Sequence, residues 1–196
     1  MNLRYRKYIY LIMLFIFVII CSCGPATSTV VMLNREKYDC KINPDQFIQL
    51  KGKRILLASI DDKSTTTSNL AYYNPERTVG YQLFYSSAHS MPQPVVSYFW
   101  YALQKGFECA GVKIEESGPV YDAELSLIFK SLTDEEINFQ ALLTKKGMLA
   151  FNKDFVVRMP KVETNEQAVL EQRAYRMLDS IVTTILSDPD FQKAFL

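Results

Sequence analysis

The chain has 196 residues, of which 22 are basic and 21 acidic, and 48% of its residues are hydrophobic. Because the charges nearly cancel, the composition excludes the strongly basic surface of a nucleic-acid-binding protein, and we expect no nucleic acid as a partner. The length and the hydrophobic fraction are typical of one packed domain of ordinary size.

The N-terminus has the three-part pattern of a secretory signal. Arg4, Arg6 and Lys7 give a positive start, and residues 8–20 form an uncharged apolar stretch of 13 residues. An α-helix of that length spans about 20 Å, less than the roughly 30 Å hydrocarbon core of a bilayer. The pattern therefore indicates a signal peptide. Counted over residues 5–23 the stretch reaches 19 residues, so a retained single-pass anchor is the alternative.

The residues that end this stretch favour a lipid anchor. The run Ile20-Cys21-Ser22-Cys23 resembles the lipobox of bacterial lipoproteins, in which an aliphatic, a variable and a small residue precede the cysteine. The resemblance implies that residues 1–22 are a signal peptide and that the thiol of Cys23 carries a diacylglyceryl group. Apart from this covalent lipid, we expect no cofactor. An ordinary signal with incidental cysteines is the alternative interpretation.

The residues after Cys23 suggest a location and a tether. An aspartate after the lipidated cysteine directs retention in the inner membrane of enterobacteria, so Gly24 favours the outer membrane, with the domain facing the periplasm. We interpret residues 23–50 as the lipidated N-terminus and a flexible leash, because residues 25–29 are small and polar. Without the signal peptide the chain has 19 basic and 21 acidic residues. It therefore has no excess positive charge that would attract it to acidic lipids.

Two cysteines remain after the signal peptide and the lipidated residue are set aside. Cys40 and Cys109 are an even number of thiols in a chain that we expect in an oxidising compartment, so a disulfide between them is one interpretation. Two separate thiols, with Cys109 buried on a helix, are the other. Sequence spacing by itself does not determine how cysteines pair.

Residues 51–196 carry the alternating and short apolar patterns of β-strands. Segments of this kind are 53–60, the less regular 78–85, and then 112–115, 123–130, 137–143 and 148–158. Lys145-Lys146-Gly147 is typical of a tight hairpin turn between the last two of them.

Two segments have helical periodicity. The first begins near Pro92 or Pro94 and ends at Gly111, a residue suited to a left-handed C-cap. The second begins with Thr164-Asn165-Glu166-Gln167, which resembles a capping box, and stops at Asp188-Pro189. We expect a single α+β domain over residues 51–196, with an antiparallel sheet of about four to five strands and both helices packed on one face.

The order of these elements behind a lipobox resembles a group of envelope lipoproteins. Residues 95–132 carry the similarity, with the helix VVSYFWYALQKGFECAG, a Val-x-Ile step and the strand AELSLIF. They resemble the auxiliary lipoproteins of bacterial ABC-type transport systems and the related YajG-type lipoproteins, and the lipopolysaccharide-assembly lipoproteins share a similar layout. The resemblance implies a non-catalytic accessory protein with a protein partner in the cell envelope, such as an ABC-type or lipid-transport system.

Enzyme chemistry has little support in the sequence. The single histidine, His89, has no nucleophile motif such as G-x-S-x-G near it, and one histidine without paired cysteines does not make a typical zinc site. The adjacent pair Asp61-Asp62 ends a predicted strand, but neighbouring side chains of a strand point to opposite faces. We therefore predict no catalytic residue, no metal site and no enzymatic activity.

A group of tyrosines is the candidate binding surface. Tyr72, Tyr73, Arg77, Tyr81 and Tyr85 belong to a short region, and tyrosine and arginine are enriched where proteins meet. The alternative is that these rings fold inward and cover the edge of the sheet. A second candidate function is that of a lipid or small-molecule carrier in the periplasm, which would need a cavity of roughly 300 Å³ or more between helices and sheet.

Overall fold

The fold is given by a computed structural model that describes residues 29–33, 35–64, 71–74, 79–83, 95–115, 118, 120–133, 135–164 and 166–196. In chain order the elements are β1 (Thr29–Leu33), η1 (Arg35–Lys37), η2 (Pro44–Leu50), β2 (Arg54–Asp62), β3 (Ala71–Asn74), β4 (Val79–Leu83), α2 (Val95–Cys109), β5 (Lys113–Glu115), β6 (Ala123–Leu132), β7 (Glu136–Lys145), β8 (Met148–Arg158), α3 (Gln167–Ser187) and α4 (Pro189–Phe195).

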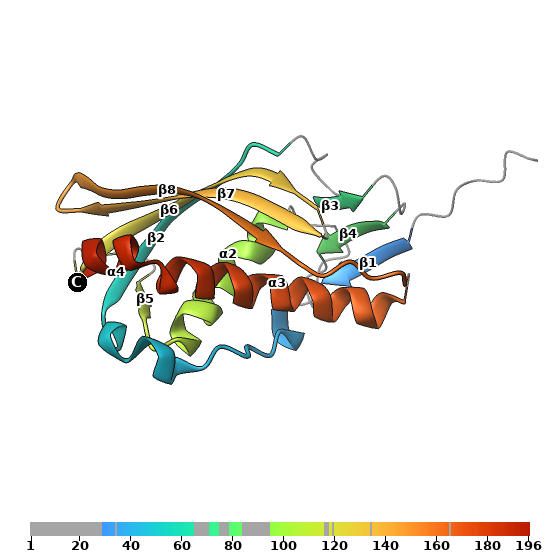
Figure 1. Cartoon of the computed structure of the whole chain (residues 1–196), viewed down its shortest axis with the longest axis horizontal. Coiled ribbons are helices and arrows are strands. Elements are labelled where there is room, and N and C mark those ends of the chain that lie inside the picture. Colours follow the sequence, from blue (N-terminus) through green and yellow to red (C-terminus); the bar gives the residue numbers. More distant parts are fainter. Residues whose placement is uncertain are drawn as a thin grey trace, which may run out of the picture.

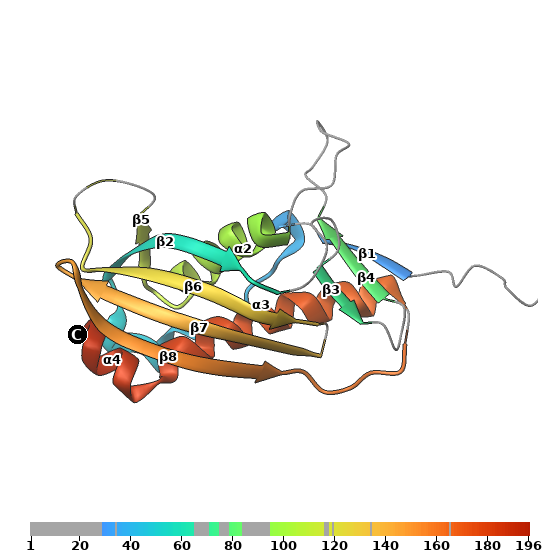
Figure 2. The same cartoon turned by 90° about the horizontal axis from the view of Figure 1, so that it is seen from above.

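The strands form two sheets. The larger has five strands in the order β5-β2-β6-β7-β8, and the smaller has three in the order β1-β4-β3. Helices α2, α3 and α4 all lie on one face of the larger sheet (Figure 1), and the smaller sheet lies beside the N-terminal end of α3 (Figure 2). The α+β class, the five strands and the placement of the helices on one face are confirmed.

The larger sheet is mixed, so the expectation of an antiparallel sheet is wrong for part of it. Strands β6, β7 and β8 form an antiparallel meander, whereas β2 runs parallel to both β5 and β6. The reason lies in the connection between β2 and β5, which contains α2. A helical crossover returns the chain to the end of the sheet at which β2 started, so the next strand runs in the same direction as β2.

The predicted hairpin between β7 and β8 is confirmed. Lys146 and Gly147 have φ angles of 51° and 76°. Two successive positive φ values are what a two-residue turn of type I′ needs to match the twist of the flanking strands.

Both predicted helices bury the apolar stripes expected of them. Gly111 follows α2 with φ of 87°, as expected for its C-cap. Among the described side chains of α2, the buried ones include Phe99, Ala102, Leu103 and Phe107, and Ala110 directly after the helix is buried as well. On α3 they include Leu170, Ala174, Met177, Ile181 and Ile185.

The capping box predicted at the start of α3 is wrong. The helix begins at Gln167 with Glu166 as its N-cap, and the Thr164 hydroxyl instead accepts a hydrogen bond from the Glu166 N–H at 3.1 Å. Threonine can close a short turn of its own, and here that turn precedes the helix.

The predicted end of the second helix is confirmed, since α3 ends at Ser187, and a further helix, α4, begins at Pro189. The Asp188 carboxylate accepts hydrogen bonds from the N–H groups of Asp190 and Phe191, both at 3.0 Å, and proline suits the first turn. The same carboxylate accepts a hydrogen bond from Lys153 on β8 at 2.7 Å. These bonds hold α4 against the end of the sheet.

The leash predicted for residues 23–50 is wrong for residues 29–50. Within this segment Val31, Leu33, Tyr38 and Leu50 are 0% exposed and Phe47 is 1% exposed. These apolar side chains complete the core, so the packed domain includes β1 and the segment up to Leu50, which lie before the predicted boundary of residue 51.

Candidate functional site

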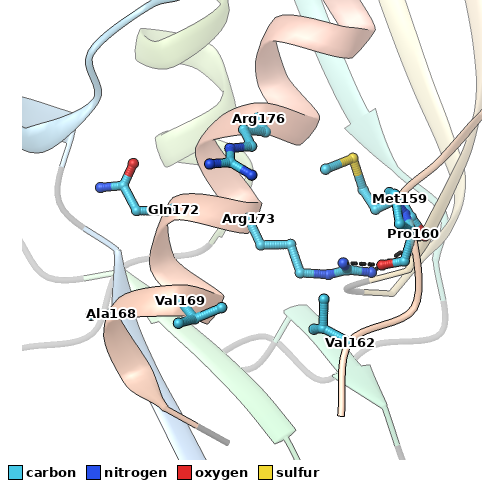
Figure 3. A pocket seen from close by; sticks show the side chains of 8 residues that line it. All are labelled: Met159, Pro160, Val162, Ala168, Val169, Gln172, Arg173 and Arg176. Carbon is cyan, nitrogen blue, oxygen red and sulfur yellow. Dashed lines mark hydrogen bonds between the residues drawn. The ribbon is translucent and has the colours of Figure 1, made fainter. Parts of the chain in front are cut away.

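A pocket of about 430 Å³ opens between helix α3 and the segment that connects β8 to it (Figure 3). The connecting segment contributes Met159, Pro160 and Val162, and α3 contributes Ala168, Val169, Gln172, Arg173 and Arg176. The helix residues recur at steps of three to four, so they share one face of α3. This volume lies in the range of pockets that hold small ligands.

Arg173 forms one wall of the pocket. Its side chain is 5% exposed, and its guanidinium donates hydrogen bonds to the backbone carbonyls of Pro160 and Met159, the latter at 3.4 Å. Figure 3 shows the arginine reaching across from α3 to the connecting segment. These bonds hold the two walls at a fixed separation.

Arg176 gives the pocket an accessible positive charge. It is exposed, and among the described residues no hydrogen bond or ion pair of its guanidinium is found. The neighbouring Val169 is 40% exposed, so apolar surface also faces solvent here. An apolar lining with a cation beside it suits a ligand that has a hydrophobic part and an anionic group.

A second cluster joins the N-terminal segment to α3. The Tyr38 hydroxyl donates a hydrogen bond to Asp179 at 2.6 Å, and its ring lies 5.9 Å from that of Tyr175. Burial, together with this hydrogen bond, raises the pKa of Tyr38 far above its usual range, so the hydroxyl stays protonated and acts as a donor. The cluster has a structural role, since its polar groups satisfy one another.

The structure brings Cys40 and Cys109 together. Both are half-buried free thiols. Burial and then the neighbouring side chain of Cys109 raise the pKa of Cys40 to about 12, so the two side chains lie near each other. The two cysteines are not covalently joined in the structure, and the disulfide stays a prediction.

The tyrosines predicted as a binding surface fall on two paired strands. Tyr72 and Tyr73 belong to β3, and Tyr81 belongs to β4, where it pairs with Ala71. Both strands belong to the smaller sheet. Two members of the predicted surface, Arg77 and Tyr85, lie outside the described residues, as do Cys23 and His89.

Sequence reasoning missed the pocket, although it contains one visible signal. Arg173 lies three residues after Leu170 and four before Met177, so it is a charged residue on an otherwise apolar stripe. A cation at such a position indicates a polar partner inside the fold. The partners are backbone carbonyls of the connecting segment, which the periodicity of a single helix does not reveal.

The described part of the chain contains no cluster of three or more metal-ligating side chains. Within the same residues, no helix combines the length and the apolar character needed to cross a membrane. The carboxylates of Asp61 and Asp62 lie at the exposed end of β2, where Asp61 pairs with Lys63 at 3.4 Å and Asp62 accepts a hydrogen bond from the Ser64 N–H at 2.9 Å. Both carboxylates thus interact with residues close to them in the sequence.

No protein-family model matches the chain, and no curated protein matches it either. Among solved structures it is similar to protein XCC0632 from Xanthomonas campestris, assigned to the family DUF330. The TM-score is 0.57 at 12% sequence identity, and the match covers 84% of this chain and 96% of that one. At this identity the likeness concerns the fold, which the two proteins share.

Proposed function

We propose that the chain is a lipid-anchored protein of the cell envelope that serves as a non-catalytic accessory or binding module of a transport or assembly system. The observation that carries this proposal is the lipobox-like run ending at Cys23, six residues before the first residue of strand β1. We place the protein at the outer membrane, facing the periplasm. Its role would be to hold or orient a protein partner, such as an ABC-type or lipid-transport system.

Two further features support a role in binding. The first is the order of strands and helices, in which the chain resembles transport-auxiliary and YajG-type lipoproteins. The smaller sheet gathers Tyr72, Tyr73 and Tyr81 at one end of the molecule (Figure 2). Tyrosines are enriched in protein interfaces, which makes this end the candidate partner surface.

Photo-crosslinking in the native envelope tests the partner. A photoreactive amino acid at position 72 or 81 should give a specific adduct with a component of a transport or assembly system, identified by mass spectrometry. The control position is Leu149, which is 58% exposed near the β7–β8 turn, at the other end of the molecule. An adduct that forms equally from position 149, or none from positions 72 and 81, contradicts an interface at the smaller sheet.

The pocket beside α3 favours a second candidate function, that of a carrier for a lipid or another small amphiphile. Its apolar walls would take a hydrocarbon chain, and Arg176 would face an anionic head group. Both parts are needed, because an apolar pocket by itself does not orient a ligand.

Blocking the pocket tests the carrier function. Val169→Trp should lower the binding of a photoactivatable fatty acid at least tenfold, because the indole would occupy the space between Val162 and Gln172. The probe is added to isolated envelopes, where it is not built into the anchor, and the labelled peptide is mapped by mass spectrometry. Val156→Trp is the matched control, since Val156 is 43% exposed on the opposite side of β8 and Val169 is 40% exposed. Equal labelling of α3 in both variants excludes the pocket as the binding site.

A further inference from the structure

The segment around Cys40 lies directly on helix α2. A Cβ atom added to Gly106 would lie 3.3 Å from the Tyr38 hydroxyl and 3.8 Å from the side chain of Ile42, so the residues on both sides of Cys40 touch this glycine. It would also lie 2.9 Å from the Val182 side chain on α3. The absence of a side chain at Gly106 therefore lets the segment and α3 approach α2 closely.

Polar contacts hold the same segment in place. The Lys105 ammonium on α2 donates a hydrogen bond to the Tyr38 carbonyl and lies 5.5 Å from the centre of the Tyr38 ring. Asp179 on α3 accepts hydrogen bonds from the Tyr38 hydroxyl at 2.6 Å and from the Lys41 N–H at 3.3 Å. Cys40 thus lies between residues that are tied to both helices.

Cys109 lies on the face of α2 that contacts the segment around Cys40. It follows Lys105 by four residues and Gly106 by three, so all three lie on the same face of α2. Lys105 contacts Tyr38, and Gly106 lies against Tyr38 and Ile42, the residues two positions before and after Cys40. The Cys109 side chain is near enough to Cys40 to affect its pKa, and both side chains are only half-buried.

We propose that Cys40 and Cys109 form a disulfide bond with each other once the chain is in an oxidising compartment. The formation of this disulfide in the cell rests on the proposed export to the envelope. The pairing of the two cysteines rests on the contacts of Tyr38 and Ile42 with helix α2. The disulfide would link the N-terminal segment, which follows the lipid anchor, to helix α2. A pull on the anchor would then be transmitted to α2 and not only to the hydrogen bonds of β1.

The oxidant is a disulfide donor, either a thiol–disulfide oxidoreductase or oxidised glutathione. The thiolate is the attacking form of either cysteine, and attack by Cys109 first gives the same products as attack by Cys40 first. The Cys109 thiolate attacks one donor sulfur, and the other donor sulfur leaves as a thiolate. The Cys40 thiol then loses its proton, attacks the Cys109 sulfur and releases the second donor thiolate. The protein loses two protons and two electrons, which reduce the donor disulfide to two thiols.

The pairing is tested on the purified full-length protein, first reduced and then equilibrated with oxidised and reduced glutathione. Free thiols are alkylated and the digest is analysed by mass spectrometry without reductant. We expect most of the protein to contain a peptide with residue 40 linked to one with residue 109. If both thiols are alkylated, or if Cys40 is linked to any other cysteine, the proposal is overturned.

Cys40→Ser and Cys109→Ser are the control variants, because serine keeps a small hydrogen-bonding side chain. The oxidised wild type should unfold at a temperature several degrees above that of the reduced wild type. Each serine variant should unfold at the same temperature with and without oxidant. An oxidant effect that persists in either variant would overturn the assignment of the stabilisation to this pair.

The same digest of protein taken directly from the envelope tests the export separately. A pair that forms with glutathione but is found reduced in the cell contradicts the proposed location and leaves the pairing supported. A pair that does not form with glutathione contradicts the pairing, whatever the location of the protein.

Discussion

Cys23→Ala is expected to abolish lipid attachment and to leave an unprocessed precursor that keeps residues 1–22. Alanine has no thiol, and the thiolate is the nucleophile that an acyl-glyceryl donor requires. Each buried methylene of an acyl chain contributes about 0.8 kcal/mol to membrane binding, so the loss of several chains removes nearly all of the anchor. The measurements are the incorporation of labelled palmitate and the intact mass of the protein.

Cys21→Ala is the matched control for this experiment. It removes a thiol two residues away, at the variable position of the lipobox-like run. We expect this variant to be labelled, cleaved and anchored like the wild type. Palmitate labelling of Cys23→Ala at the level of the wild type would show that the lipid is attached elsewhere or that residues 1–22 are not a lipoprotein signal.

Phe129→Ala is expected to have the largest effect on stability. Phe129 is 0% exposed in the middle of β6, and its ring centre lies 4.9 Å from that of Phe99 on α2 and 6.5 Å from that of Phe139 on β7. Such a truncation leaves a cavity between helix and sheet and costs about 3–5 kcal/mol. Domains of this size have free energies of unfolding of about 5–15 kcal/mol, so the melting temperature should fall on the order of 10 °C.

Val156→Ala is the comparison for this variant. Val156 lies on β8 but is 43% exposed on the face of the sheet that the helices leave open, and its truncation should cost about 0.5 kcal/mol or less. Urea unfolding of both variants, followed by circular dichroism, measures the difference. Equal losses of stability would mean that the ring contacts of Phe129 contribute no more than ordinary surface packing.

Sequence patterns were sufficient wherever one element determines its own structure. The stripe from Leu170 to Ile185 predicted α3, and the turn at Lys146 and Gly147 predicted the β7–β8 hairpin. In both cases the information is local, because a helical period or a positive φ involves residues a few positions apart. The start of α3 was less predictable, since Thr164 can form either a cap or a turn of its own and the two differ little in energy.

The direction of β2 and the start of the domain depended on residues far apart in the chain. The alternation of Ile55 and Leu57 shows that the strand is half-buried, but it is the same for parallel and antiparallel neighbours. Likewise, the small polar residues 25–29 suggested a leash, although Tyr38 and Phe47 further along are buried against the rest of the core. A short segment becomes ordered when another part of the molecule offers an apolar surface for it, and periodicity within the segment does not record that surface.

The lipobox-like run at Cys23 is a property of the sequence by itself, because it is defined by four consecutive residues and their apolar neighbours. The α+β class and the apolar faces of both long helices were also determined locally, by hydrophobic periodicity. Only the tertiary structure decided that Cys40 lies near Cys109 and that Arg173 reaches the carbonyl of Pro160. Those contacts join residues 69 and 13 positions apart, and they exist only because packing of α2 and α3 against one sheet brings distant segments together.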